Sequence, residues 1–86
     1  MKHQLIWEAT AWEDYLYWQT HDKKMLKKIN TLIEAASREP FTGIGKPEPL
    51  QYNLKGLWSR RIDLEHRLVY ALNGNDLIIV SCRHHY

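Results

Sequence analysis

The chain has 86 residues with one cysteine, and its 12 basic and 10 acidic side chains leave a formal net charge of +2. This length predicts a single domain over residues 1–86, and a lone cysteine excludes an internal disulfide and a cysteine-rich zinc site. The charge is too small to identify a nucleic-acid-binding protein by itself. Without a secretion signal or an apolar run of membrane-spanning length, we expect a soluble cytoplasmic protein that contacts no membrane.

The first half predicts one short strand and two helices. Residues 5–7 favour a strand, and Thr10 with Glu13 has the spacing of a capping box that begins the first helix. Four residues then recur at helical spacing, which favours a core-facing stripe over a binding site: Trp12, Tyr15, Leu16 and Gln19.

The second predicted helix begins after Asp22, runs to about Arg38 and is closed by Pro40. Its apolar face comprises Met25, Ile29, Leu32, Ile33 and Ala36. Four lysines form either a solvated surface or a contact for RNA or an acidic partner: Lys23, Lys24, Lys27 and Lys28.

The second half predicts an irregular loop over 41–49, followed by strands over 50–54, 57–64, 67–72 and 77–85. Lys55-Gly56 can form a turn, and Asn73-Gly74 predicts a hairpin with positive φ at both residues. The element order predicts an α+β domain with two N-terminal helices packed on one face of a mainly antiparallel twisted sheet.

Strand alternation separates a core face from a charged face. The predicted core face includes Leu68, Tyr70 and Leu72, together with Ile78, Val80 and Cys82, whose thiol we expect to be buried rather than nucleophilic. If the strand register allows it, one open face gathers Arg61, Arg67, Arg83 and His85.

The chain end Cys82–Tyr86 concentrates an arginine, two imidazoles and a phenol, which indicates either a proton-transfer site or a solvated strand end. Glu48 stands between Pro47 and Pro49, so it is either a pre-positioned base or a rigid, exposed loop residue. His84 and His85 are adjacent and point in opposite directions on a strand, so we expect no metal site and no cofactor.

These residue types suit a ribonuclease, which needs a base for the ribose 2′-OH, cations for the phosphate and an acid for the leaving oxygen. Glu48, Arg67 and His85 can fill these three roles. Further contacts to RNA can come from Lys46, Arg61, Arg83 and Tyr86.

Five segments together resemble one family over nearly the whole chain: residues 12–18, 45–50, 58–62, 65–70 and 82–86. The chain closely resembles the YoeB toxins of bacterial toxin–antitoxin systems, within the RelE/ParE superfamily. The resemblance implies a compact microbial-ribonuclease-like fold, a homodimer, a YefM-type antitoxin, and cleavage of mRNA in the ribosomal A site. It also implies Glu48 as general base, His85 as general acid, Arg67 as the transition-state cation and Tyr86 in the catalytic site, with Lys46 and Arg61 on phosphate.

The implied product carries a 2′,3′-cyclic phosphate or the 3′-phosphate formed by its hydrolysis. Ile44, Gln51 and His84 depart from the family pattern and lower the local positive or aromatic character. Two alternatives remain: a non-cleaving, ParE-like inhibitor of DNA gyrase, and a degenerate member that only binds antitoxin.

Overall fold

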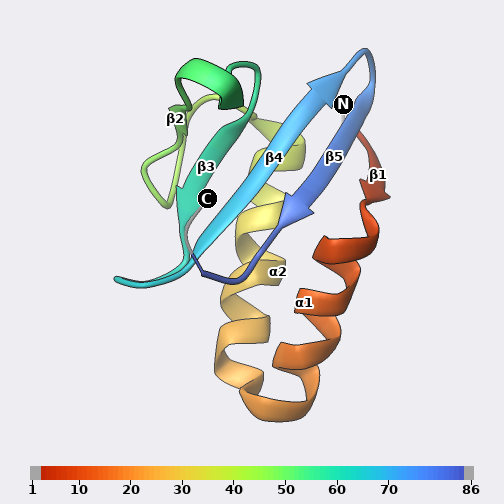
Figure 1. Cartoon of the computed structure of the whole chain (residues 1–86), viewed down its shortest axis with the longest axis vertical. Helices are drawn as coiled ribbons and strands as arrows, with labels where there is room; N and C mark the ends of the chain where they lie inside the picture. Colours follow the sequence, from red (N-terminus) through yellow and green to blue (C-terminus); the bar gives the residue numbers. More distant parts are fainter. Residues whose placement is uncertain (1–2, 85–86) are drawn as a thin grey trace.

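The computed structural model describes residues 3–84 and orders the strands β1-β5-β4-β3-β2 in one five-stranded sheet (Figure 1). A 3₁₀ turn, η1 (Tyr52–Leu54), separates β2 from β3. The remaining elements are β1 (Gln4–Trp7), α1 (Ala9–His21), α2 (Lys23–Arg38), β2 (Glu48–Pro49), β3 (Trp58–Arg61), β4 (Arg67–Asn73) and β5 (Asp76–Ser81).

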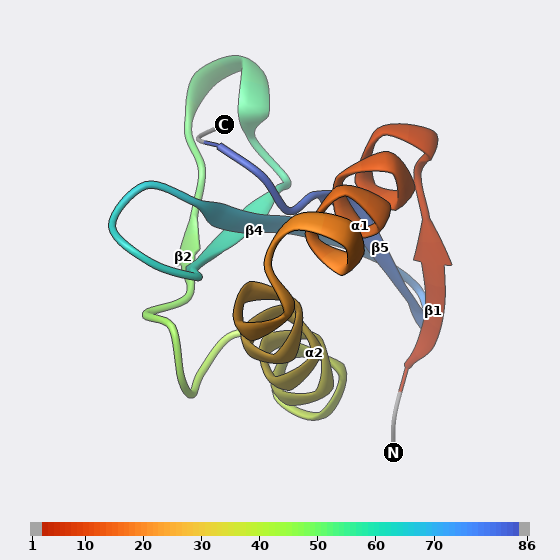
Figure 2. The ribbon, with the colours of Figure 1, turned by 90° about the horizontal axis from the view of Figure 1, so that it is seen from below.

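The predicted α+β architecture is confirmed. Both helices pack against one face of the sheet, as Figure 2 shows from below. The pairs β2–β3, β3–β4 and β4–β5 are antiparallel, whereas β1 runs parallel to β5 at the edge. Within residues 3–84, neither helix combines the length and hydropathy that a membrane span requires.

Helix α2 forms as the sequence predicts. Asp22 caps its first turn, because its Oδ1 accepts hydrogen bonds from the backbone N–H groups of Lys24 (3.1 Å) and Met25 (3.2 Å). The backbone N–H of Asp22 also donates to the carbonyl of Trp18, so the same residue closes α1. The five predicted core residues of α2, Met25, Ile29, Leu32, Ile33 and Ala36, are all buried.

The predicted capping box at the start of α1 is wrong. The helix begins at Ala9, and Glu8 is its N-cap without a side-chain hydrogen bond. The N–H of Glu8 instead donates to the carbonyl of Ile79 at 3.0 Å, which continues the contact between β1 and β5. Strand pairing therefore fixes where the helix starts, and Thr10 already lies inside it.

The predicted core stripe of α1 is also largely wrong. Trp12 and Leu16 are 46% and 41% exposed, whereas Ala11 and Trp18 are buried. Of the predicted stripe, Tyr15 is partly buried and packs on Trp7, with ring centroids 4.9 Å apart. The aromatic spacing indicated a helix correctly, but several large residues on α1 left its buried side ambiguous.

The strand predicted over 50–54 is wrong, because pairing is confined to Glu48–Pro49 and the η1 turn follows. Tyr52 has a φ of +58°, which interrupts an extended strand. The β4–β5 hairpin is confirmed, but its two-residue loop is Gly74-Asn75, since Asn73 pairs with Asp76. Of these loop residues, only Gly74 has a positive φ, at +61°.

The predicted buried face of β5 is wrong for Ile78 and Val80, which are only partly buried. Leu77 and Ile79 face the core instead, because they pair with Leu72 and Tyr70 of β4. A register shift between Val69 and Tyr70 lies on the neighbouring strand. Strand β5 ends at Ser81, so Cys82 is buried outside its alternation.

A buried arginine ties the loop between α2 and β2 to the sheet. Arg60 of β3 is fully buried and donates to the backbone carbonyls of Glu39, Thr42 (2.8 Å) and Ile44 (2.9 Å). Its Nε also donates to the hydroxyl of Tyr70 at 3.1 Å. Burial raises the pKa of Tyr70, although the bond and charge of Arg60 act in the opposite direction.

Gly45 lies close against both α2 and the sheet, and Gly45→Ala tests the importance of this packing. An added Cβ would lie 2.8 Å from Leu32 Cδ2 and 3.2 Å from the carbonyl of Arg61, at a φ of +83°. We expect Gly45→Ala to lower the free energy of unfolding by about 1–3 kcal/mol more than Gly56→Ala does. Gly56 is the matched control because it has a φ of +100° with nothing within 4 Å. Equal losses in denaturant titrations would contradict close packing at Gly45.

Candidate active site

The sheet register brings three predicted site residues to the face opposite the helices. Glu48 pairs with Ser59 of β3, and Arg61, two residues further along β3, pairs with Arg67 of β4. Paired residues share a face, and so do residues two apart on a strand. The structure therefore confirms the predicted grouping of Arg61 with Arg67 and adds Glu48 to it.

Glu48 and Arg67 are in direct contact. Nη1 of Arg67 lies 3.4 Å from Oε1 of Glu48, and the side chains are 15% and 52% exposed, respectively. Arg67 is thus largely buried while the Glu48 carboxylate remains accessible from solvent. A base that must take a proton from a substrate needs this accessibility.

Arg61 and Arg67 place like charges directly across an antiparallel pair, which is unfavourable unless an anion lies nearby. Glu48 compensates part of this charge. Lys46 is a further exposed cation near this group. The carbonyl of the preceding residue, Gly45, accepts a 2.6 Å hydrogen bond from the N–H of Arg61, which brings Lys46 close to β3. The arrangement is suited to a phosphate group.

The face is less open than predicted. Ser59 and Val69 lie on it and are 0% and 1% exposed. The Oγ of Ser59 has no hydrogen-bond partner among residues 3–84. The accessible part of the site is therefore the strip formed by Glu48 and Arg61, with Arg67 at its base.

The structure does not bring Arg83 into contact with this group. Its guanidinium carbon lies 3.4 Å from the ring centroid of Tyr17, on α1. The predicted convergence of Arg83 with Arg61 and Arg67 is therefore wrong, because the chain has left β5 at Ser81 and strand alternation no longer applies. A role for Arg83 in phosphate binding stays a prediction.

His85 and Tyr86 lie outside the described residues, so their predicted roles stay predictions. The segment that leads to them is described and meets the site directly: the carbonyl of His84 accepts a 3.0 Å hydrogen bond from the backbone N–H of Arg67. His84, which departs from the family pattern, therefore has a structural contact with the site.

Three potential metal ligands meet where the sequence shows no ligand spacing. Side-chain atoms of Glu65, His66 and His84 lie within 4.8 Å of one another. Nδ1 of His66 accepts a 2.7 Å hydrogen bond from the N–H of His84, so in the neutral ring Nε2 carries the proton. Nε2 then faces Oε1 of Glu65 at 3.7 Å as a donor, which is not the form of a metal ligand.

Asp63 shapes the turn between β3 and β4 that presents His66 and Arg67. Partial burial alone would raise the pKa of Asp63, but hydrogen bonds from the N–H groups of His66 and Glu65 outweigh it, so its pKa lies below the usual value. These bonds measure 2.7 Å and 2.8 Å. A charged acceptor at this corner keeps the turn closed.

Cys82 is a buried thiol, as predicted. Burial, with a smaller effect from the charge of Asp14, raises its pKa to about 12. We expect no reaction with an aromatic disulfide reagent at pH 8 until denaturant is added. Because the folded pKa is raised, the stabilisation from the neutral thiol is complete below the ordinary pKa of 9.0 and is lost as pH rises towards 12. Labelling of the folded protein at the rate of a free cysteine would contradict this burial.

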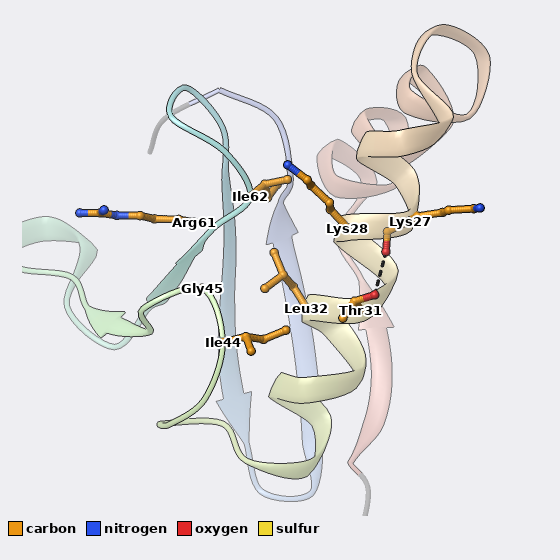
Figure 3. Close-up of a pocket in the computed structure, with 8 residues that line it drawn as sticks. All are labelled: Lys27, Lys28, Thr31, Leu32, Ile44, Gly45, Arg61 and Ile62. Carbon is orange, nitrogen blue, oxygen red and sulfur yellow. Dashed lines mark hydrogen bonds between the residues drawn. The ribbon is translucent and has the colours of Figure 1, made fainter.

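A separate hollow of about 290 Å³ lies between α2 and the loop that contains Gly45 (Figure 3). Leu32, Ile44 and Ile62 supply its apolar surface, and Lys28 extends towards Ile62. The guanidinium of Arg61 points away from it. The hollow is therefore distinct from the charged strip.

Three side chains that hold the site were missed from the sequence: Asp14, Trp18 and His66. Each binds the backbone of residues 82–84. Their partners are 68, 64 and 18 positions away, respectively, and no sequence periodicity predicts such contacts. The available sequence signal was a polar side chain beside an apolar stripe, but this signal does not identify the residue that the side chain contacts.

Comparison with known proteins gives a consistent result. The family model for the YoeB-like toxin of bacterial type II toxin-antitoxin systems matches residues 7–86. Toxin YoeB of a Synechocystis species is 63% identical over 83 residues, which cover 96% of each chain.

Two solved structures from Staphylococcus aureus match the whole chain and are covered completely by it. The YoeB dimer has a TM-score of 0.91 at 48% identity, and YoeB in a heterotetrameric YoeB–YefM toxin–antitoxin complex has 0.89 at 48%. Sequence, family model and fold agree over nearly the full length. The chain therefore belongs to the YoeB family of toxins of bacterial type II toxin–antitoxin systems.

Proposed function

We propose that this toxin is an endoribonuclease that cleaves mRNA in the ribosomal A site and so stops translation. The observation that carries the proposal is the contact between Glu48 and Arg67, which pairs an accessible carboxylate with a largely buried cation on one sheet face. A base next to a phosphate-binding cation is what transesterification of RNA requires. A protein that only binds a partner needs no such pair.

In the proposed reaction, Glu48 takes the proton of the ribose 2′-OH while that oxygen attacks the adjacent phosphorus. Arg67 stabilises the negative charge that develops on the phosphoryl oxygens, with Arg61 and Lys46 as further cations. His85 gives a proton to the 5′-oxygen as its bond to phosphorus breaks. The products are a 2′,3′-cyclic phosphate, which water can open to a 3′-phosphate, and a 5′-hydroxyl end.

Dependence on the ribosome is part of the proposal. The Glu48 side chain is 52% exposed, and the charged strip lies on the sheet surface. Such a site supplies chemical groups but few contacts to orient a flexible RNA strand, and orientation accounts for a large share of catalysis. The ribosomal A site can supply that orientation to a message that it already holds.

The proposed protein partners are a YefM-type antitoxin and a second copy of the chain. The similar S. aureus structures are a YoeB dimer and a YoeB–YefM complex. Co-expression with a YefM-type antitoxin is the appropriate test, with size-exclusion chromatography of the chain alone as a test of dimerisation.

Primer extension on translating ribosomes tests the activity. The wild-type protein should produce a new 5′ end within the A-site codon, and His85→Gln should not. Free RNA and a gyrase supercoiling assay are measured in parallel. Intact messages together with blocked supercoiling would favour the ParE-like alternative, and intact messages with antitoxin binding alone would favour the degenerate one.

A further inference from the structure

Beyond β5, three side chains hold the backbone of residues 82–84, in addition to one backbone hydrogen bond from Arg67 of β4. The N–H of Cys82 donates to Oδ2 of Asp14 at 3.0 Å, and its carbonyl accepts from Nε1 of Trp18 at 2.8 Å. The N–H of His84 then donates to Nδ1 of His66 at 2.7 Å. We call this segment, residues 82–84, the tail.

His66 is itself rigidly placed. Its side chain is 10% exposed and meets Trp18 edge to face, with ring centroids 4.8 Å apart at 83°. Its N–H donates to Asp63, and its carbonyl accepts from the N–H of Ile62 at 3.0 Å. A side chain fixed by packing and by hydrogen bonds at its own backbone can transmit that rigidity to the atom it binds.

His84 connects this support to the candidate site. Its N–H is bound by His66, and its carbonyl accepts from the N–H of Arg67. His84 has a φ of +65°, a conformation that costs free energy for a residue with a side chain and persists only where its surroundings impose it. The two hydrogen bonds therefore constrain the peptide groups on both sides of the His84 Cα, the bond from His84 to His66 before it and the bond from Arg67 to His84 after it.

We propose that His66 is a positioning residue: through Nδ1 it holds the backbone of His84, and with it the tail, beside Arg67. This inference rests on the proposed ribonuclease function, in which His85 is the acid. His66 touches no RNA in this scheme and transfers no proton. Its contribution is the hydrogen-bond acceptor Nδ1 for the N–H of His84, and loss of that acceptor displaces the tail.

Two substitutions separate the acceptor of His66 from its ring. His66→Phe keeps a flat ring against Trp18 and removes the acceptor, whereas His66→Asn removes the ring and keeps an oxygen near the position of Nδ1. We expect His66→Phe to lower the single-turnover rate at saturating enzyme by about 100-fold, because small displacements of reacting groups have effects of this size. The enzyme concentration that gives half of the maximal rate should stay within threefold of wild type in His66→Phe. His66→Asn should retain most of the wild-type rate.

Amide hydrogen exchange at His84 provides a readout that does not require activity. Exchange should accelerate in His66→Phe at least tenfold more than in His66→Asn, after normalisation to the global stability of each variant. Equal rate losses in the two variants, or unchanged His84 exchange in His66→Phe, would overturn the proposal. A wild-type protein that leaves messages intact would reject the ribonuclease function, while the exchange data would still judge the tail contact separately.

Discussion

Glu48→Gln is expected to lower single-turnover cleavage of ribosome-bound message by about 10²–10⁴-fold, the usual contribution of a positioned general base. The amide keeps the size of the side chain but cannot take the 2′-OH proton. Because the contact with Arg67 lies at 3.4 Å and Glu48 is half-exposed, its loss should change stability by less than about 1 kcal/mol. The rate effect therefore separates from any folding effect.

Glu13→Gln is the matched control for this experiment, since Glu13 is an exposed carboxylate on α1. It removes the same charge from the protein and should leave cleavage within twofold of wild type. Rates are measured with excess toxin over programmed ribosomes, so that product release does not mask the chemical step. Cleavage by Glu48→Gln within threefold of wild type would reject its role as base.

Arg60→Leu is expected to cost about 3–5 kcal/mol of unfolding free energy, a large value for one substitution. Leucine fills part of the volume but donates no hydrogen bond. Three loop carbonyls and the hydroxyl of Tyr70 would then lose the guanidinium that they share. Urea titration of the purified variant measures the loss.

The neighbouring Arg61 provides the control for Arg60. Arg61→Leu removes the same charge from an exposed position on the same strand and should change stability by less than about 0.5 kcal/mol. It should weaken RNA cleavage instead. A stability loss below about 1 kcal/mol in Arg60→Leu would show that water replaces the guanidinium at these carbonyls.

Local patterns predicted the parts of the fold that are locally determined. Helix α2 has one apolar face and an Asp22 cap, and both signals act within a few residues. The grouping of Arg61 with Arg67 also followed from alternation, because both lie inside regular strands. Glu48 was identified by its two flanking prolines, although its contact with Arg67 required the register.

The remaining features depend on contacts distant in sequence. Helix α1 begins where pairing with Ile79 ends, not at the local Thr10 signal. Arg83 left the charged face because β5 ends at Ser81, and alternation carries no information beyond a strand end. Similarly, the proposed role of His66 depends on a hydrogen bond to His84, which the residues around neither histidine predict.

The adjacent arginines of β3 point to opposite faces of the sheet, and this arrangement restricts the motion of the loop before Glu48. The inward Arg60 binds the loop that precedes Glu48, while the outward Arg61 lies on the charged strip. Opening that loop would leave the buried guanidinium of Arg60 without its carbonyl partners, so the loop cannot fluctuate independently of the core. We therefore expect the segment before Glu48 to open only together with the core, so that the charged strip is already assembled before any ligand binds.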